Sequence, residues 1–118
     1  MKVLVTGATG FTGGHLAQYL AGRGDEVRAL VRARSRQRFD RSALPGRGVT
    51  AADGDLMDRA SVGRAVKDVD VVYHIAATYR EAGQPDSAYR AINVDGTRNV
   101  LEAAKENWSL GHGLAQFA

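Results

Sequence analysis

The feature that most constrains this chain is a glycine-rich segment between a short apolar run and a helical pattern. The run from Lys2 to Thr6 is apolar enough for a buried strand, and glycine follows it at once. From Phe11 onward apolar residues recur at helical spacing, and Gly22 or Gly24 offers a left-handed helix end. A strand, a glycine turn and a helix in this order bring the free N–H groups of the first helical turn to the strand end.

The turn itself is Thr6-Gly7-Ala8-Thr9-Gly10-Phe11-Thr12-Gly13, with G-x-x-G-x-x-G spacing in place of the commoner G-x-G-x-x-G. Gly7 permits the tight turn, Gly10 lets the backbone approach a phosphate, and Gly13 lets the helix pack closely. The free N–H groups and the positive end of the helix dipole then face the phosphates. A glycine turn without a ligand is the competing interpretation, and the strand–turn–helix context favours a dinucleotide pyrophosphate over it.

The rest of the chain alternates between strand and helix patterns. Strands are expected at 26–32, 48–52 and 69–77, and helices at 58–67 and from Asp86 or Ser87 to about Glu106, with Asp58 as a helix cap. The polar stretch 34–47 is expected to be a loop with room for a short helix. Such alternation implies right-handed crossovers. The predicted fold class is α/β, a partial Rossmann (doubly wound) parallel sheet of about four strands in the order third, second, first, fourth, within three α/β/α layers.

Composition excludes several other classes of protein. The 118 residues, 44% of them hydrophobic, suit one small domain, and no cysteine is present for disulfides or cysteine-based zinc sites. No segment approaches the roughly 20 apolar residues of a membrane span, and the N-terminal apolar run is too short for a signal peptide. A cytoplasmic location is therefore expected. The three histidines show no metal-ligand spacing, so no metal is expected.

Arginine is concentrated just after the second expected strand. Five arginines lie within ten residues, at 32, 34, 36, 38 and 41, and the net charge is +3. Dinucleotide sites that select NAD usually carry an acidic residue at this strand end, whereas Arg32 suits the 2′-phosphate of NADP, with Arg34 able to share the role. NADP is thus the expected cofactor and NAD the alternative. A solvated basic loop and a nucleic-acid surface are competing interpretations, and no nucleic-acid partner is expected.

Two more strand ends carry candidate residues. After the third strand, Asp55 is placed to accept from an adenine amino group and Leu56 to cover the ring, against the competing roles of helix cap or turn. After the fourth strand, small side chains leave room for a nicotinamide ribose. His74, at that strand end, is interpreted as a hydrogen-bonded structural residue. Gly96, which is costly inside a helix, is expected to allow a close approach.

Together these segments resemble the extended short-chain dehydrogenase/reductase family, in particular its dihydroflavonol-reductase-like and nucleotide-sugar-epimerase-like members. The resemblance covers residues 1 to about 105 and rests on the glycine segment and on three later motifs: Asp53-Gly54-Asp55-Leu56, His74-Ile75-Ala76-Ala77 and Asn93-Val94-Asp95-Gly96-Thr97. It implies a set of cofactor-binding residues: Gly7, Thr9, Gly10, Phe11 and Thr12 at the pyrophosphate, Arg32 at the 2′-phosphate, Asp55 and Leu56 at the adenine, Ala76, Ala77 and Thr78 at the nicotinamide ribose, and Asn93 as support from the helix.

The family's catalytic residues have no counterpart here. Members of the family carry a Ser or Thr and a Tyr-x-x-x-Lys pair, but none of Lys2, Lys67 and Lys105 has a tyrosine four residues before it. Residues 107–118 do not resemble the expected next strand. The expectation is an incomplete NAD(P)-binding domain at 1–106 with an atypical tail and no substrate domain, truncated or altered in frame. It would be an inactive part of a reductase or epimerase acting on a carbinol or ketone; the alternative is a non-catalytic NADP-binding regulatory or structural module.

One expectation concerns association. A fifth strand would normally flank the fourth, and the sequence offers none. The open edge would then present unpaired N–H and C=O groups beside the apolar run 71–75, and such an edge is a template for pairing with another chain. A homo-oligomer formed through this edge is therefore expected.

Overall fold

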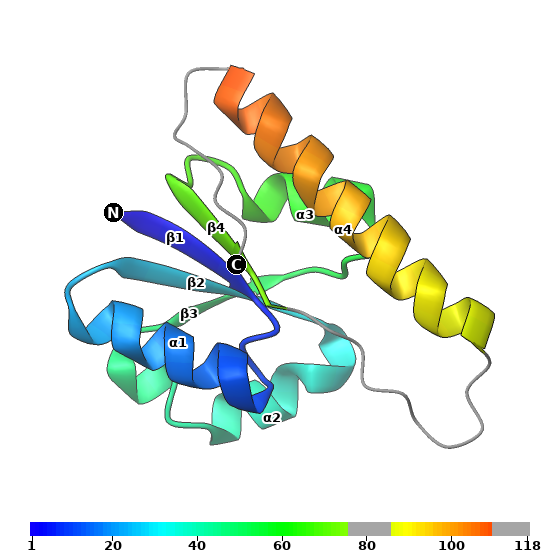
Figure 1. Cartoon of the computed structure of the whole chain (residues 1–118). Coiled ribbons are helices and arrows are strands. Elements are labelled where there is room, and N and C mark those ends of the chain that lie inside the picture. Colours follow the sequence, from blue (N-terminus) through cyan, green and yellow to red (C-terminus); the bar gives the residue numbers. More distant parts are fainter. Residues whose placement is uncertain (76–85, 110–118) are drawn as a thin grey trace.

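The computed structural model describes residues 1–75 and 86–109, which form a parallel sheet between two layers of helices (Figure 1). The strands are β1 (Lys2–Thr6), β2 (Glu26–Val31), β3 (Thr50–Asp53) and β4 (Val71–His74). The helices are α1 (Phe11–Gly22), α2 (Arg36–Arg41), α3 (Arg59–Ala65) and α4 (Asp86–Ser109), with short 3₁₀ turns η1 (Ala33–Ser35) and η2 (Pro45–Arg47).

The sheet has the order β3-β2-β1-β4, and all its neighbouring strands are parallel. Val3 of β1 pairs with Val27 of β2 on one side and with Val71 of β4 on the other. Helices α1 and α2 cover one face of the sheet, and α3 and α4 cover the other (Figure 1). The predicted strand order and three-layer arrangement are confirmed. The order reverses next to β1, so the carboxyl ends of β1 and β4 flank the crevice where ligands of such sheets bind.

Alternate residues of the strands supply two separate cores. Val3 and Val5 pack with Ala17 and Leu20 of α1, whereas Leu4 points to the opposite face and packs with Val100 of α4. All of these residues are at most 1% exposed. Burying one such Val or Leu side chain contributes roughly 1.5–3 kcal/mol. Burial on both faces explains why these strands are nearly continuous apolar runs.

The stretch from 34 to 47 is more structured than its polar sequence indicates. The short helix allowed for in this stretch is α2, and η1 and η2 flank it. Phe39 and Leu44 are only 3% and 2% exposed and belong to the core under α1. Two apolar side chains thus fix a segment whose remaining residues are mostly exposed and polar.

Several element ends differ from the expected ones. Strand β2 ends at Val31, because Arg32 already accepts the Ser35 N–H in the turn η1. Strand β4 begins at Val71, because the buried Val69 closes a turn by donating to the Val66 carbonyl. Its predicted extension to residue 77 enters a part of the chain outside the described residues.

Helix α4 continues to Ser109, three residues beyond its expected end at about Glu106. Asn107 explains the extension, because it joins the helix to the turn before β4. Its Nδ2 donates to the Val69 carbonyl at 3.1 Å, and its Oδ1 accepts from the Asp68 N–H at 3.3 Å. Among the described residues, no helix is long and apolar enough to cross a membrane.

Candidate dinucleotide site

The loop after β1 makes a tight turn that depends on glycine. Gly7 has φ of 75°, in the left-handed region where a side chain is strained. The Gly10 N–H donates to the Gly7 carbonyl at 3.1 Å and closes the turn, and α1 begins at the next residue. The role predicted for Gly7 follows directly from this geometry.

The first turn of α1 presents free backbone donors. Within the described part of the chain, no side chain caps the helix at Gly10, and its first turn holds no acidic residue. Phe11 is 79% exposed, and Thr12 is exposed beside it. An uncapped helix start combines unsatisfied N–H groups with the positive end of the helix dipole, which is the combination that binds phosphate.

The glycines at 10 and 13 have different surroundings. A Cβ on Gly13 would collide with the Gly7 carbonyl group, so the close packing of this turn excludes any side chain there. A Cβ on Gly10 would have the Gly7 oxygen as its nearest described neighbour, at an ordinary contact distance of 3.4 Å. Packing among the described residues therefore excludes a side chain at Gly13 but not at Gly10, and Gly10 lines a groove in the surface.

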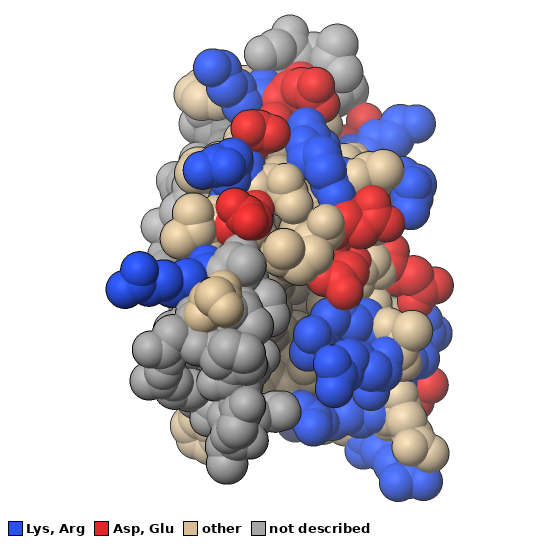
Figure 2. All heavy atoms as spheres, turned by 90° about the vertical axis from the view of Figure 1, so that its right-hand side faces the viewer, with Lys and Arg blue, Asp and Glu red and all other residues tan. Residues whose placement is uncertain are grey.

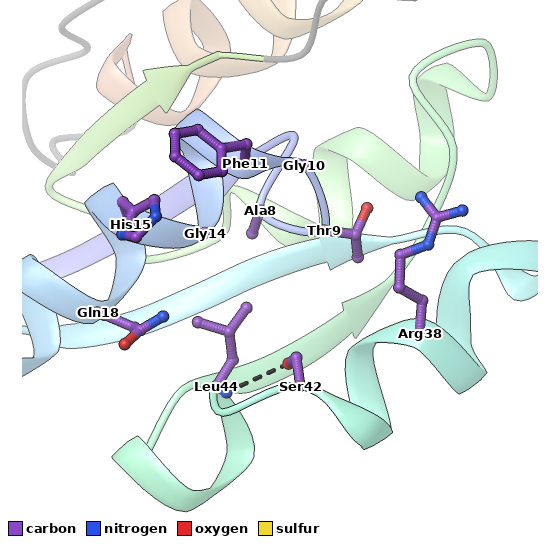
Figure 3. Close-up of a pocket in the computed structure, with 10 residues that line it drawn as sticks. All are labelled: Ala8, Thr9, Gly10, Phe11, Gly14, His15, Gln18, Arg38, Ser42 and Leu44. Carbon is purple, nitrogen blue, oxygen red and sulfur yellow. Dashed lines mark hydrogen bonds between the residues drawn. The ribbon is translucent and has the colours of Figure 1, made fainter.

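A groove of about 200 Å³ runs beside this loop, between α1 and the α2–η2 segment (Figure 3). Thr9 and Arg38 stand at one end of it and His15 and Gln18 at the other. The full lining is Ala8, Thr9, Gly10, Phe11, Gly14, His15, Gln18, Arg38, Ser42 and Leu44. Arg38 was not singled out from the sequence, because nothing in a run of five arginines tells which one the α2 helix turns toward the glycine loop.

The neighbouring arginines differ in how far their charge is already compensated. Arg36 donates to Asp53 at 2.9 Å and to Asp40 at 3.2 Å. Both carboxylates raise the pKa of the Arg36 guanidinium above its ordinary value, and the hydrogen bond to Asp40 contributes most. Arg32 and Arg34 are exposed at the end of β2. Figure 2 shows Lys and Arg side chains gathered in the lower part of one face, below a region where acidic and basic side chains mix.

At the end of β3, the residues predicted to meet the adenine are part of a structured turn. Asp55 uses one carboxylate oxygen to accept the Met57 N–H at 2.9 Å, so the competing role of turn residue is realised. Leu56 is half-buried, and its carbonyl accepts from Asn99 Nδ2 at 2.7 Å. A Cβ on Gly96 would lie 3.1 Å from the Leu56 Cβ, which confirms the close approach expected at Gly96.

His74 is hydrogen-bonded through both ring nitrogens, as expected. Its Nδ1 lies 2.7 Å from Thr6 Oγ1, and its Nε2 lies 3.0 Å from Thr97 Oγ1. Burial lowers the pKa of the imidazole below its ordinary value. Both ring nitrogens are thus engaged between β1 and α4, and neither faces the groove.

The carboxyl ends of the strands therefore bring together the glycine loop, Arg32, the pair Asp55 and Leu56, and His74. Asn93 lies half-buried on α4. Ala76, Ala77 and Thr78, assigned to the nicotinamide ribose, lie outside the described residues. Within the described ranges, no group of three or more potential ligands is placed to hold a metal ion. The order of the sheet and the open glycine loop define a Rossmann-type dinucleotide fold.

Comparison with known proteins agrees with this class. The model of the NAD dependent epimerase/dehydratase family matches residues 3–116. The chain is 40% identical over 105 residues to sterol demethylase protein B of Methylococcus capsulatus, covering 89% of this chain and 31% of that protein. It is 39% identical over 120 residues to 2-alkyl-3-oxoalkanoate reductase of Stenotrophomonas maltophilia, covering 99% and 32%.

Among solved structures, the Bordetella bronchiseptica enzyme WbmH in complex with NAD+ superposes with a TM-score of 0.69 at 32% identity, over 90% of this chain and 36% of that one. The chain belongs to the NAD dependent epimerase/dehydratase family. It spans about a third of the length of the curated relatives it matches.

Proposed function

We propose that this chain is the NADP(H)-binding portion of a short-chain-type oxidoreductase or epimerase that acts on a carbinol or ketone carbon. The observation that carries the proposal is the start of α1, where N–H groups that no described side chain caps adjoin Gly10, which lines the groove. Bound nicotinamide would supply the hydride chemistry at its C4 atom. The chain's own residues would bind and orient the dinucleotide, with the backbone from Gly7 to Thr12 around its pyrophosphate.

Arginines adjacent to the loop favour the phosphorylated cofactor. Arg32 stands at the strand end where an acidic residue would accept from a ribose hydroxyl, and arginine can only donate. Arg38 and Thr9 line the same end of the groove and offer a second cation and a hydroxyl. Arg36 is already held by two carboxylates, so it adds less to the attraction for a phosphate.

The same proposal holds that the chain alone does not turn over a substrate. A positioned proton donor is typically worth about 10²–10⁴-fold in rate, and no Tyr-x-x-x-Lys pair occurs in the 118 residues. NADPH oxidation with ketones, aldehydes or nucleotide sugars should stay at background. Reproducible turnover that disappears when cofactor binding is removed would contradict this part.

The decisive experiment is a fluorescence titration of the purified chain with NADPH. Gly10→Val should abolish binding, because the branched side chain fills the space where the pyrophosphate meets the backbone. Gly22→Val is the matched control: it also lies in α1, and no described atom lies within 4 Å of an added Cβ. Unchanged affinity in Gly10→Val would show that the ligand does not lie on this loop.

Association through the sheet edge is a separate part of the proposal. Strand β4 pairs with β1, and no other strand of the described residues borders its second edge. Val94, Leu101 and Trp108 of α4 are each about half exposed. We expect light scattering to show a dimer or larger assembly, or aggregation on heating. A monomer whose melting temperature is high and independent of concentration would oppose it.

A further inference from the structure

One turn of α4, from Gly96 to Asn99, touches two separate segments at the carboxyl edge of the sheet. Thr97 reaches His74 at the end of β4, at 3.0 Å. Asn99 donates to the Leu56 carbonyl just after β3, at 2.7 Å. No ligand role was assigned to Thr97 or Asn99, and both are half-buried on the inner side of the helix. We call residues 96–99 the α4 clasp.

Through His74, the clasp is linked to the start of the glycine loop. The imidazole bridges Thr97 and Thr6, and Thr6 Oγ1 also accepts the Ile75 N–H at 3.2 Å. Thr6 is fully buried and immediately precedes Gly7, whose backbone begins the tight turn. A shift of Thr6 therefore moves the residue from which the phosphate-binding backbone departs.

Through Leu56, the clasp is linked to the turn after β3. The absence of a side chain at Gly96 lets the helix backbone approach Leu56, because an added Cβ would lie only 3.1 Å from the Leu56 Cβ. The bond from Asn99 then fixes the backbone of Leu56 at that approach. One helical turn thus contacts the turn after β3 directly and is linked to the glycine loop through His74 and Thr6.

We propose that the α4 clasp is a positioning element that sets the separation between the glycine loop and the turn after β3, and thereby the affinity for the dinucleotide. The proposal rests on the proposed function, because the two segments are those assigned to the pyrophosphate and the adenine. Thr97 and Asn99 act through His74, Thr6 and Leu56 and do not themselves touch the cofactor. Because a dinucleotide would contact both segments at once, holding them at a fixed separation reduces the conformational entropy that is lost on binding.

The competing explanation is that these bonds only hold α4 on the sheet. Asn107 separates the two explanations, because it anchors the other end of the same helix through two hydrogen bonds to residues 68 and 69. Those residues precede β4, at the opposite edge of the sheet from the glycine loop. Loosening α4 at Asn107 should affect stability without changing the spacing at the cofactor edge.

The experiment compares Thr97→Val, which keeps the shape and removes the hydroxyl, with Thr97→Ser, which restores it, and with Asn107→Ala. NADPH titrations and urea unfolding are measured on each full chain. Thr97→Val should raise the Kd for NADPH about 3- to 10-fold, the size of one lost hydrogen bond. Thr97→Ser should bind like the parent, and Asn107→Ala should lose stability with its Kd unchanged. Asn99→Leu should weaken binding in the same direction as Thr97→Val.

A second measurement does not depend on cofactor. Amide hydrogen exchange of Ile75, whose N–H is bonded to Thr6, should accelerate in Thr97→Val but not in Thr97→Ser or Asn107→Ala. Equal Kd values for Thr97→Val and Asn107→Ala would overturn the clasp, as would unchanged exchange at Ile75. If the parent chain binds no NADPH at all, the proposed function fails, and the exchange data alone then decide whether the link from α4 to the glycine loop exists.

Discussion

Two strand-to-helix turns at the same edge of the sheet satisfy their backbones in opposite ways. In the turn from β1 to α1, no described side chain caps the helix. In the turn from β3 to α3, Asp58 caps the helix by accepting the Ser61 N–H at 3.4 Å. Ser61 Oγ also accepts the Asp55 N–H and lies 2.8 Å from the Asp58 carbonyl.

The difference teaches where a ligand belongs. In the turn after β3, side chains of the turn and of α3 accept the N–H groups of Asp55, Met57 and Ser61. The turn after β1 keeps glycine where side chains would cap or fill, and its donors stay available. A turn that leaves backbone N–H groups open beside a groove suits an anion such as the proposed pyrophosphate, whereas a turn that closes them suits an uncharged group such as the proposed adenine.

The largest effect that tests this comparison is at Gly13. Because a Cβ there would collide with the Gly7 carbonyl, Gly13→Ala should lower the free energy of unfolding by about 3 kcal/mol or more, at the upper end of overpacking costs. Gly22→Ala should instead raise it by about 0.5–1 kcal/mol, the helix propensity difference. Urea unfolding measures both. A Gly13→Ala protein as stable as the parent would show that the turn can relax, and the contrast with the turn after β3 would weaken.

The next effect concerns the charges beside the open turn. Arg32→Asp and Arg38→Ala should each weaken NADPH binding by about 10- to 150-fold, the worth of a charge-assisted hydrogen bond of roughly 1.5–3 kcal/mol. Arg38→Ala should leave NADH affinity unchanged, and Arg32→Asp should reverse the cofactor preference. Arg36→Ala is the matched control, since two carboxylates already hold that side chain. Equal affinity of the parent chain for NADPH and NADH would remove the role of both arginines.

A smaller effect is expected in the closed turn. Ser61 is 2% exposed, so Ser61→Ala should cost roughly 1–2 kcal/mol of unfolding free energy by leaving its partners unpaired. Dinucleotide affinity should not change beyond that loss of stability. Ser35→Ala is the control, because Ser35 precedes α2 without making a side-chain cap bond. A loss of affinity as large as that of Arg38→Ala would show that the closed turn contributes as much to binding as the open one.

Local patterns were enough to predict the sheet order and the glycine loop. The apolar run before Gly7 and the helical pattern after Phe11 lie within a few residues of each other, and strand–helix alternation leaves few topologies. The cap at Asp58 was predicted for the same reason and is confirmed, because its partner Ser61 stands three residues on. Such features depend on neighbours in the sequence.

Features that depend on distant segments were missed or only partly foreseen. Phe39 and Leu44 are buried because α2 and η2 dock under α1, which their polar flanks do not reveal. Arg38 enters the groove through the same docking. The link from Thr97 through His74 to Thr6 joins positions more than 20 and nearly 70 residues apart, and only tertiary packing brings them together. The close approach at Gly96 was expected, whereas its partner Leu56 was not.

The smallest effect is a pH dependence that should distinguish the two turns through His74. Burial lowers its pKa in the folded chain below the ordinary 6.5, so the unfolded chain binds the proton more readily in that interval. The contribution of neutral His74 to the free energy of unfolding is fully present above about pH 6.5. It decreases as the pH falls below this value, until the pH has passed the folded-state pKa. The slope cannot exceed about 1.4 kcal/mol per pH unit, the limit for one proton. Urea unfolding between pH 7.5 and 5 measures it.

In the same series, His74→Asn should remove this slope, because it removes the imidazole whose pKa burial lowers. Arg23 holds the pKa of Asp25 below its ordinary value. The contribution of this carboxylate to stability is therefore lost only at lower pH, and it does not affect the slope measured above pH 5. The unfolding free energy of Ser61→Ala should be lower than that of the parent at every pH, with the same slope, because the turn after β3 contains no histidine. Parallel curves for the parent and His74→Asn would show that the support of the glycine loop does not depend on a neutral imidazole. A steeper curve in Ser61→Ala would couple the closed turn to His74 and erase the distinction between the two.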